Sequence, residues 1–126
     1  MRVLLLDDDQ LSLCSSEDAL SMNGHECESL LTPDKAIVGY DVDRFDLIIS
    51  GICMLKMSVV EFYRKVCETC SKVRIILING FSRMEMALST FKGIAFDILE
   101  KPLDFAKLMD ILRGLEEKLD SKTAKS

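Results

Sequence analysis

Short apolar runs alternate with segments of helical periodicity along the whole of this 126-residue chain. The predicted strands cover residues 3–6, 26–31, 46–50, 73–78 and 95–99, and the predicted helices cover residues 10–23, 32–40, 59–70, 82–91 and 105–119. Most of the strand segments are apolar at successive positions, which is typical of strands buried on both faces. Regular alternation of this kind favours a parallel sheet with right-handed crossovers.

We therefore expect an α/β fold: a flavodoxin-like, doubly wound sheet of five parallel strands in the order 2-1-3-4-5, with helices on both faces. A chain of this length forms a single domain. Residues 1–119 are predicted to form that domain, and residues 120–126 a frayed polar tail or the start of a linker. No apolar run approaches the roughly 20 residues of a membrane helix, and the start does not match a signal peptide, so a cytoplasmic location is expected.

Acidic, basic and amide residues and one glycine follow the predicted strands. They are Asp7, Asp8, Gly51, Asn79 and Lys101. In an open parallel sheet, ligands bind outside the carboxyl ends of the strands, where the strand order reverses. We expect these five residues to line one pocket. The adjacent Asp9 is expected to be structural, because an aspartate at a helix start accepts backbone N–H bonds.

Three segments of the chain resemble landmarks of the response regulator receiver family. They are residues 6–9, 46–54 and 100–102. In that family an acidic pair, here Asp7 and Asp8, binds magnesium together with a phosphoacceptor aspartate after the third strand. A lysine, matched by Lys101, contacts the phosphoryl group, and the peptide bond before the next residue, Pro102, is expected to be cis. Magnesium prefers hard oxygen ligands, which explains the carboxylates.

The chain departs from the family pattern at three positions of the phosphorylation switch. Gly51 stands at the position of the phosphoacceptor aspartate, Asn79 at that of a serine or threonine, and Ile98 at that of an aromatic side chain that moves on activation. Magnesium binding at Asp7 and Asp8 is then expected to be weak, and no catalytic residue or cofactor is predicted. The sequence thus predicts a non-enzymatic pseudo-receiver, a phosphorylation-independent protein-interaction module of two-component phosphorelay signalling.

Two other functions stay open. A rebuilt receiver could take phosphate from a histidine kinase on a nonstandard residue, with Asp7 or Asp8 as candidates. Ser50 is expected to point away from the pocket, and Asp46 to lie at the far end of the same strand. A nucleotide or other small-molecule site is disfavoured because no glycine-rich loop follows the first strand and the three aspartates would repel a phosphate. An engineered replacement at Gly51 also stays open.

Protein partners are the expected targets of this domain. In the receiver family the fourth helix, fifth strand and fifth helix commonly form the effector or dimer face. The matching positions here are Met84, Met86, Lys92, Asp97 and Lys107. A homodimer through that face stays open. The net charge of −5 argues against direct nucleic-acid binding, and no membrane binding is expected.

The chain has five cysteines and one histidine. An odd number of cysteines at this low density indicates reduced thiols rather than a disulfide scaffold. Cys67 and Cys70 have the spacing of a metal or redox pair, but no second pair and no nearby histidine complete a zinc site. His25 follows the Asn23-Gly24 helix stop and is predicted to be a surface residue.

Overall fold

The computed structural model describes residues 1–7, 9–30, 44–51, 59–69, 74–79, 97–100 and 103–125. The elements are β1 (Arg2–Leu6), α1 (Gln10–Met22), β2 (Glu26–Leu30), β3 (Leu47–Gly51), α3 (Val59–Thr69), β4 (Arg74–Asn79), β5 (Asp97–Glu100) and α5 (Phe105–Lys125). Each of these begins and ends within about two residues of the predicted segment, except at the far end of α5. The predicted helices over 32–40 and 82–91 lie outside the described residues.

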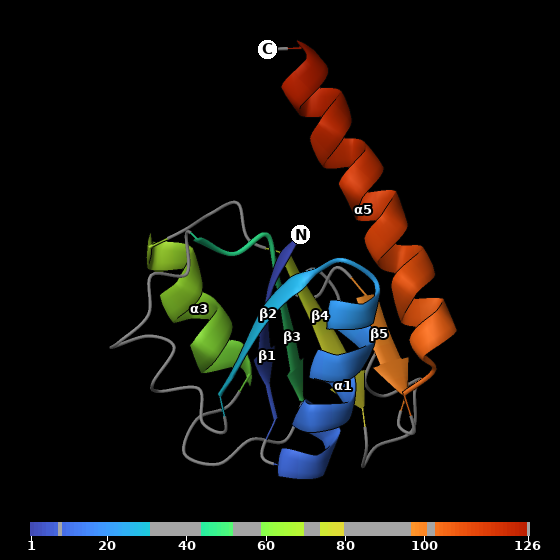
Figure 1. Cartoon of the computed structure of the whole chain (residues 1–126). Helices are drawn as coiled ribbons and strands as arrows, with labels where there is room; N and C mark the ends of the chain where they lie inside the picture. Colours follow the sequence, from blue (N-terminus) through green and yellow to red (C-terminus); the bar gives the residue numbers. More distant parts are fainter. Residues whose placement is uncertain are drawn as a thin grey trace.

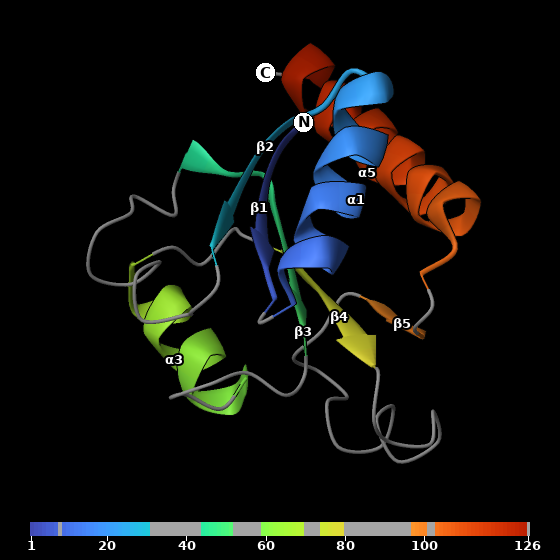
Figure 2. The same ribbon diagram turned by 60° about the horizontal axis from the view of Figure 1, so that its bottom comes forward.

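The five strands form one sheet in the order β2-β1-β3-β4-β5, and every neighbouring pair is parallel. Helices α1 and α5 lie on one face of the sheet, and α3 lies on the other (Figures 1 and 2). The predicted α/β fold, including the strand order, is confirmed. Because all strands run the same way, their carboxyl ends meet at one edge, from which the chain enters α1 and α5.

The largest apolar cluster lies between the sheet and the α1/α5 layer. Its members are Val3, Leu5, Leu13, Leu20, Leu47, Ile49, Ile76, Ile78, Leu99, Leu108, Leu112 and Leu115. Strand residues in this cluster alternate along the sequence, as expected when successive side chains point to opposite faces. The intervening residues, such as Leu4 and Ile48, are also buried and face the side of α3, where Phe62 is completely buried. Both faces of the sheet are therefore covered.

Helix α1 begins and ends at capping residues. The Asp9 side chain accepts hydrogen bonds from the N–H of Leu11 and from the hydroxyl of Ser12, both at 3.0 Å. At the other end Asn23 is the C-cap, and Gly24 has a φ of 83°, a left-handed conformation that glycine adopts without a steric penalty. The predicted helix start at Asp9 and stop at Asn23-Gly24 are both confirmed.

Helix α5 differs from the expectation at its end. We expected a frayed tail from Asp120, whereas the helix continues through Lys125. Residues 120–125 contain neither glycine nor proline, so nothing in this stretch interrupts the intrahelical hydrogen bonds. The last part of α5 extends past the edge of the sheet where the strands begin (Figure 1). No helix in the described part of the chain combines the length and apolar character needed to cross a membrane.

Candidate functional site

Strand register brings three of the predicted site residues to the carboxyl edge of the sheet. Leu6 is paired with Ser50, so the next residues, Asp7 and Gly51, are neighbours. Gly51 is in turn paired with Ile78, and Asn79 follows directly on the next strand. Glu100 is paired with Asn79, so the chain leaves β5 at the same edge. Asp8, Lys101 and Pro102 lie outside the described residues.

Gly51 lies against the carboxyl group of Asp7. A Cβ atom built on Gly51 would be 3.8 Å from Oδ1 and 4.0 Å from Cγ of Asp7, and 4.0 Å from the carbonyl oxygen of Leu6. These are ordinary van der Waals separations, and Gly51 does not have the positive φ that would require glycine. The fold therefore has room for a side chain at position 51, pointing towards Asp7.

Asp7 is held in place by the chain around it. The residue is 8% exposed, and its Oδ1 accepts a hydrogen bond from the N–H of Asp9 at 3.1 Å. Its own N–H donates to the carbonyl oxygen of Leu30 at 3.3 Å, which ties this loop to β2. Burial of a carboxylate is unfavourable unless hydrogen bonds compensate it, so this geometry fixes a hydrogen-bond acceptor beside Gly51.

Asn79 and Ile98 are both buried, with 4% and 5% exposure. Their neighbours Ile78 and Leu99 belong to the cluster under α1 and α5, so strand alternation directs Asn79 and Ile98 towards the other face of the sheet. The N–H of Ile98 donates a hydrogen bond to Oδ1 of the preceding residue, Asp97, at 2.8 Å. Position 98 thus holds an aliphatic side chain within the packed interior.

Two nearby polar residues do not face Asp7. Ser50 is fully buried, and its hydroxyl donates to the carbonyl oxygen of Gly51 at 3.0 Å. Asp46 lies at the opposite edge of the sheet, where its Oδ2 accepts from the N–H of Arg2 at 3.0 Å. Both placements agree with the strand-based prediction, and neither residue is positioned to act beside Asp7.

Metal ligands do not cluster in the described part of the chain. Among those residues, no three His, Cys, Asp or Glu side chains gather closely enough to hold an ion. Cys70 and the side chain of Cys67 lie outside the description, as does Asp8. Cys14 and Cys27 are free thiols, and burial raises the pKa of the Cys27 thiol.

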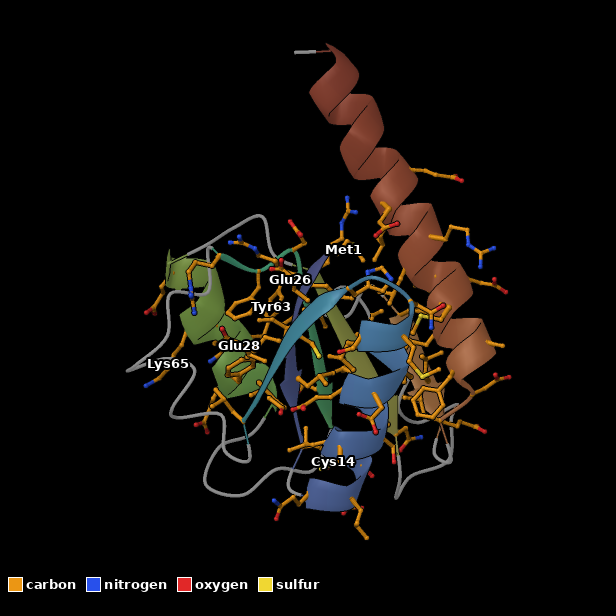
Figure 3. The ribbon with its side chains drawn as sticks, viewed as in Figure 1. Met1, Cys14, Glu26, Glu28, Tyr63 and Lys65 are labelled. Carbon is orange, nitrogen blue, oxygen red and sulfur yellow. The ribbon has the colours of Figure 1, made fainter. Side chains whose placement is uncertain are left out.

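The prediction that His25 is a surface residue was wrong. His25 is 9% exposed, and its Nδ1 lies 3.1 Å from the amino group of Met1 and 3.3 Å from Oε1 of Glu116. Burial lowers the pKa of His25, the positive charge of the Met1 amino group lowers it further, and Glu116 raises it. Met1 lies at the edge where the strands begin, far from the carboxyl ends (Figure 3), so this cluster is separate from the Asp7 pocket.

Comparison with known protein families identifies the family of this chain. The model of the response regulator receiver domain matches residues 3–113, a range that includes all five described strands apart from Arg2 and extends into the first half of α5. The chain belongs to the response regulator receiver domain family. Receiver domains are signalling modules of two-component systems, so the predicted signalling class is confirmed at that level.

Curated relatives of this receiver domain are larger regulators. The chain is 28% identical to the C4-dicarboxylate transport transcriptional regulatory protein DctD of Rhizobium meliloti (strain 1021), over 92% of this chain and 25% of that protein. It is 27% identical to the transcriptional regulatory protein ZraR of Salmonella typhimurium, over 86% of this chain and 25% of that protein. The receiver domain therefore spans about a quarter of the length of these relatives.

Solved receiver structures share the fold. A CheY-like response regulator receiver domain from Methanospirillum hungatei JF-1 superposes with a TM-score of 0.74 at 24% identity, over 99% of this chain and 98% of that one. A two-component response regulator from Clostridium difficile superposes with a TM-score of 0.83 at 17% identity, over 94% of this chain and 98% of that one. At such identities these likenesses establish the fold alone.

Proposed function

We propose that this receiver domain signals without an aspartyl phosphate, as a pseudo-receiver that works through protein contacts. The observation that carries the proposal is Gly51, which has no side chain where the fold leaves room for one beside Asp7. An acceptor aspartate at this place would supply both the nucleophile and a third magnesium ligand. Without it, the pocket lacks the group on which phosphoryl transfer to a receiver depends.

The residues that would sense a phosphoryl group support the same reading. Asn79 carries an amide where a hydroxyl is expected, and Ile98 cannot repeat the movement of an aromatic ring between buried and exposed positions. Asp7 and Asp8 would offer two carboxylates to magnesium, which leaves the ion bound mainly by water. We infer weak magnesium binding at most, with no cofactor and no enzymatic activity in the working domain.

A second candidate is a receiver phosphorylated on a nonstandard residue. Asp7 is the described carboxylate nearest Gly51, which is the observation in its favour. Against it, Asp7 is almost completely buried and its Oδ1 already accepts a hydrogen bond from Asp9. A carboxylate held this way is a poor nucleophile compared with one that projects into an open pocket, so the pseudo-receiver is the favoured function.

Titration with beryllofluoride, a mimic of the phosphoryl group on aspartate, tests the proposal. In two-dimensional NMR with magnesium present, we expect no saturable shift at Asp7, Gly51 or Asn79. Incubation with acetyl phosphate followed by mass spectrometry should show no added phosphate. Saturable beryllofluoride shifts that reach α5, or a stable acyl phosphate, would overturn the proposal and support the second candidate.

Protein partners are part of the proposal. DctD and ZraR are named as transcriptional regulatory proteins, and the chain matches only a quarter of each, so we propose that this domain controls a larger regulator or a separate partner in the cytoplasm. The proposed contact face includes Asp97 on β5 and Lys107, which is exposed on α5. Met84, Met86 and Lys92 lie outside the described residues. Sedimentation of the wild-type chain and of Lys107→Glu would test a homodimer through this face.

A further inference from the structure

The turn that joins α1 to β2 contains an Asn-Gly pair, Asn23-Gly24. In such a pair the backbone nitrogen of glycine can attack the side-chain amide carbon of asparagine, because glycine has no side chain to obstruct the approach. The new N–C bond closes a five-membered succinimide ring, and the side-chain nitrogen leaves as ammonia. Water then opens the ring to aspartate or isoaspartate. The reaction needs no co-reactant other than water.

This turn is open to solvent and uncrowded. Asn23 and Gly24 are both exposed. A Cβ atom built on Gly24 would meet no heavy atom within 4 Å beyond its own chain neighbours. Water can therefore reach the pair, and ammonia can leave it. Neither burial nor steric crowding prevents the reaction at this place.

Hydrogen bonds, in contrast, engage both reacting groups of the pair. The side-chain nitrogen Nδ2 of Asn23, which would leave, donates to the carbonyl oxygen of Ala19 at 2.8 Å. The backbone nitrogen of Gly24, which would attack, donates to the carbonyl oxygen of Ser21 at 3.1 Å. Both acceptors belong to the last turns of α1. The end of this helix therefore holds the pair in an unreactive arrangement.

Ring closure requires the backbone of the turn to rotate. Asn23 has a ψ of 15°, and a rotation about its Cα–C bond is needed to bring the Gly24 nitrogen against the side-chain carbon. That rotation would also move the next residue, His25, whose N–H donates to the carbonyl oxygen of Leu20 at 3.0 Å. Several hydrogen bonds at the end of α1 must break together, so the reaction waits for this end of the helix to open.

The products would weaken the same helix end. A carboxylate at position 23 cannot donate to the carbonyl oxygen of Ala19, and it places negative charge at the negative end of the helix dipole. Isoaspartate also adds one carbon to the backbone between α1 and His25. His25 is buried, and its Nδ1 lies 3.3 Å from Oε1 of Glu116 on α5. A change in this turn is therefore transmitted to the contact with α5.

We propose that Asn23-Gly24 is a site of spontaneous deamidation that the end of α1 controls, and that its products weaken the contact between His25 and α5. The modified fraction then increases with the age of the protein and with the time that the turn spends open. The inference goes beyond the proposed function and does not rest on it, because the reaction needs neither a phosphoryl group nor a partner protein.

Peptide mass spectrometry of the incubated full chain tests the site, since deamidation changes the mass of the peptide that contains Asn23. Product should accumulate in the folded chain, at a rate at least tenfold lower than in the chain unfolded by urea. The other Asn-Gly pair, Asn79-Gly80, is the reference for the unfolded rate. Equal rates at Asn23 in the folded and unfolded chain would overturn the control by α1. A folded chain that stays unmodified at Asn23 while unfolded Asn79 reacts would overturn the site.

Matched variants test the role of the helix end. Ser21→Gly and Ser21→Ala remove the same hydroxyl group and differ in helix propensity, so the glycine variant should deamidate about threefold faster. Melting temperatures establish that both are folded. Asn23→Asp has no amide to lose and carries the charge of the product. In NMR, the resonances of His25 and Glu116 should shift in this variant and in aged wild-type chain. Equal rates in the two Ser21 variants, or unchanged His25 resonances in aged chain, would contradict the proposal.

Discussion

Gly51 and Asp7 face each other across the ends of β3 and β1, with 3.8 Å between a Cβ atom built on Gly51 and Oδ1 of Asp7. The separation is neither a clash nor a void. Position 51 is thus a glycine that the backbone does not require, in a place where an added side chain would contact the acidic loop. A carboxylate side chain can therefore be introduced at position 51 without a change in the backbone.

Gly51→Asp should increase magnesium affinity by at least about tenfold, or about 1.4 kcal/mol, because it places a second carboxylate beside that of Asp7. Isothermal titration with magnesium measures the change. Gly51→Asn is the matched control, with the same shape and no charge, and should stay near the wild-type affinity. Equal gains in both variants would mean that shape, not charge, limits the site.

Asp9→Ala should lower the free energy of unfolding by about 1 kcal/mol, because the helix loses a cap that accepts from Leu11 and Ser12. The expected fall in melting temperature is about 4 °C. Asp18→Ala removes a charge from the exposed middle of the same helix and caps nothing, so it serves as the control. A loss in Asp18→Ala as large as that in Asp9→Ala would show that the charge, rather than the cap, matters.

Stability should fall as the pH drops through about 6.5. Burial and the nearby Met1 amino group lower the folded pKa of His25 below its ordinary value of about 6.5, so the unfolded chain binds a proton first and protonation favours unfolding. Above pH 6.5 the neutral histidine keeps its full contribution. Melting temperatures measured between pH 7.5 and pH 5.5 should therefore decline more steeply in the wild-type chain than in His25→Gln. Parallel curves for the two proteins would exclude His25 as the cause.

Leu112→Ala should destabilise the domain by about 3 kcal/mol, because Leu112 is fully buried in the α1/α5 layer and its removal leaves a cavity. Chemical denaturation measures the loss. Arg113→Ala, next along the helix and mostly exposed, should change stability by less than about 0.5 kcal/mol. If Leu112→Ala costs as little as Arg113→Ala, then α5 contributes little to the stability of the core.

The sheet could be predicted from the sequence because its signals are local. The apolar run before Asp7 and the capping residues Asp9 and Gly24 mark element boundaries through the physics of a few adjacent residues. Parallel order then places strand ends at a common edge, which is why Asp7 and Gly51 could be expected to meet. Their separation and the room left for a side chain depend on strand register, which the sequence does not display.

The environment of His25 could not be predicted in the same way. Its burial depends on Glu116 and Met1, which are distant along the chain and meet His25 only after α5 packs on the sheet. The residues next to a histidine that follows a helix stop do not indicate whether that histidine is buried or exposed. A cavity lined in part by Asp7 was not predicted either. Its lining residues come from β1, α1, β3, β4, α5 and the residue Leu103 before α5, so no single segment of the sequence indicates that it exists.

Helix α5 is long, and the core residues that it contributes lie in its first half. Its 21 residues give a helix about 31 Å long, and Leu108, Leu112 and Leu115 pack its first half against the sheet. A tilt of about 5° at the base of this helix would displace the far end by about 3 Å, simply from its length. A small change in the packing beneath α5 would thus be expected to displace its far end by more than its base.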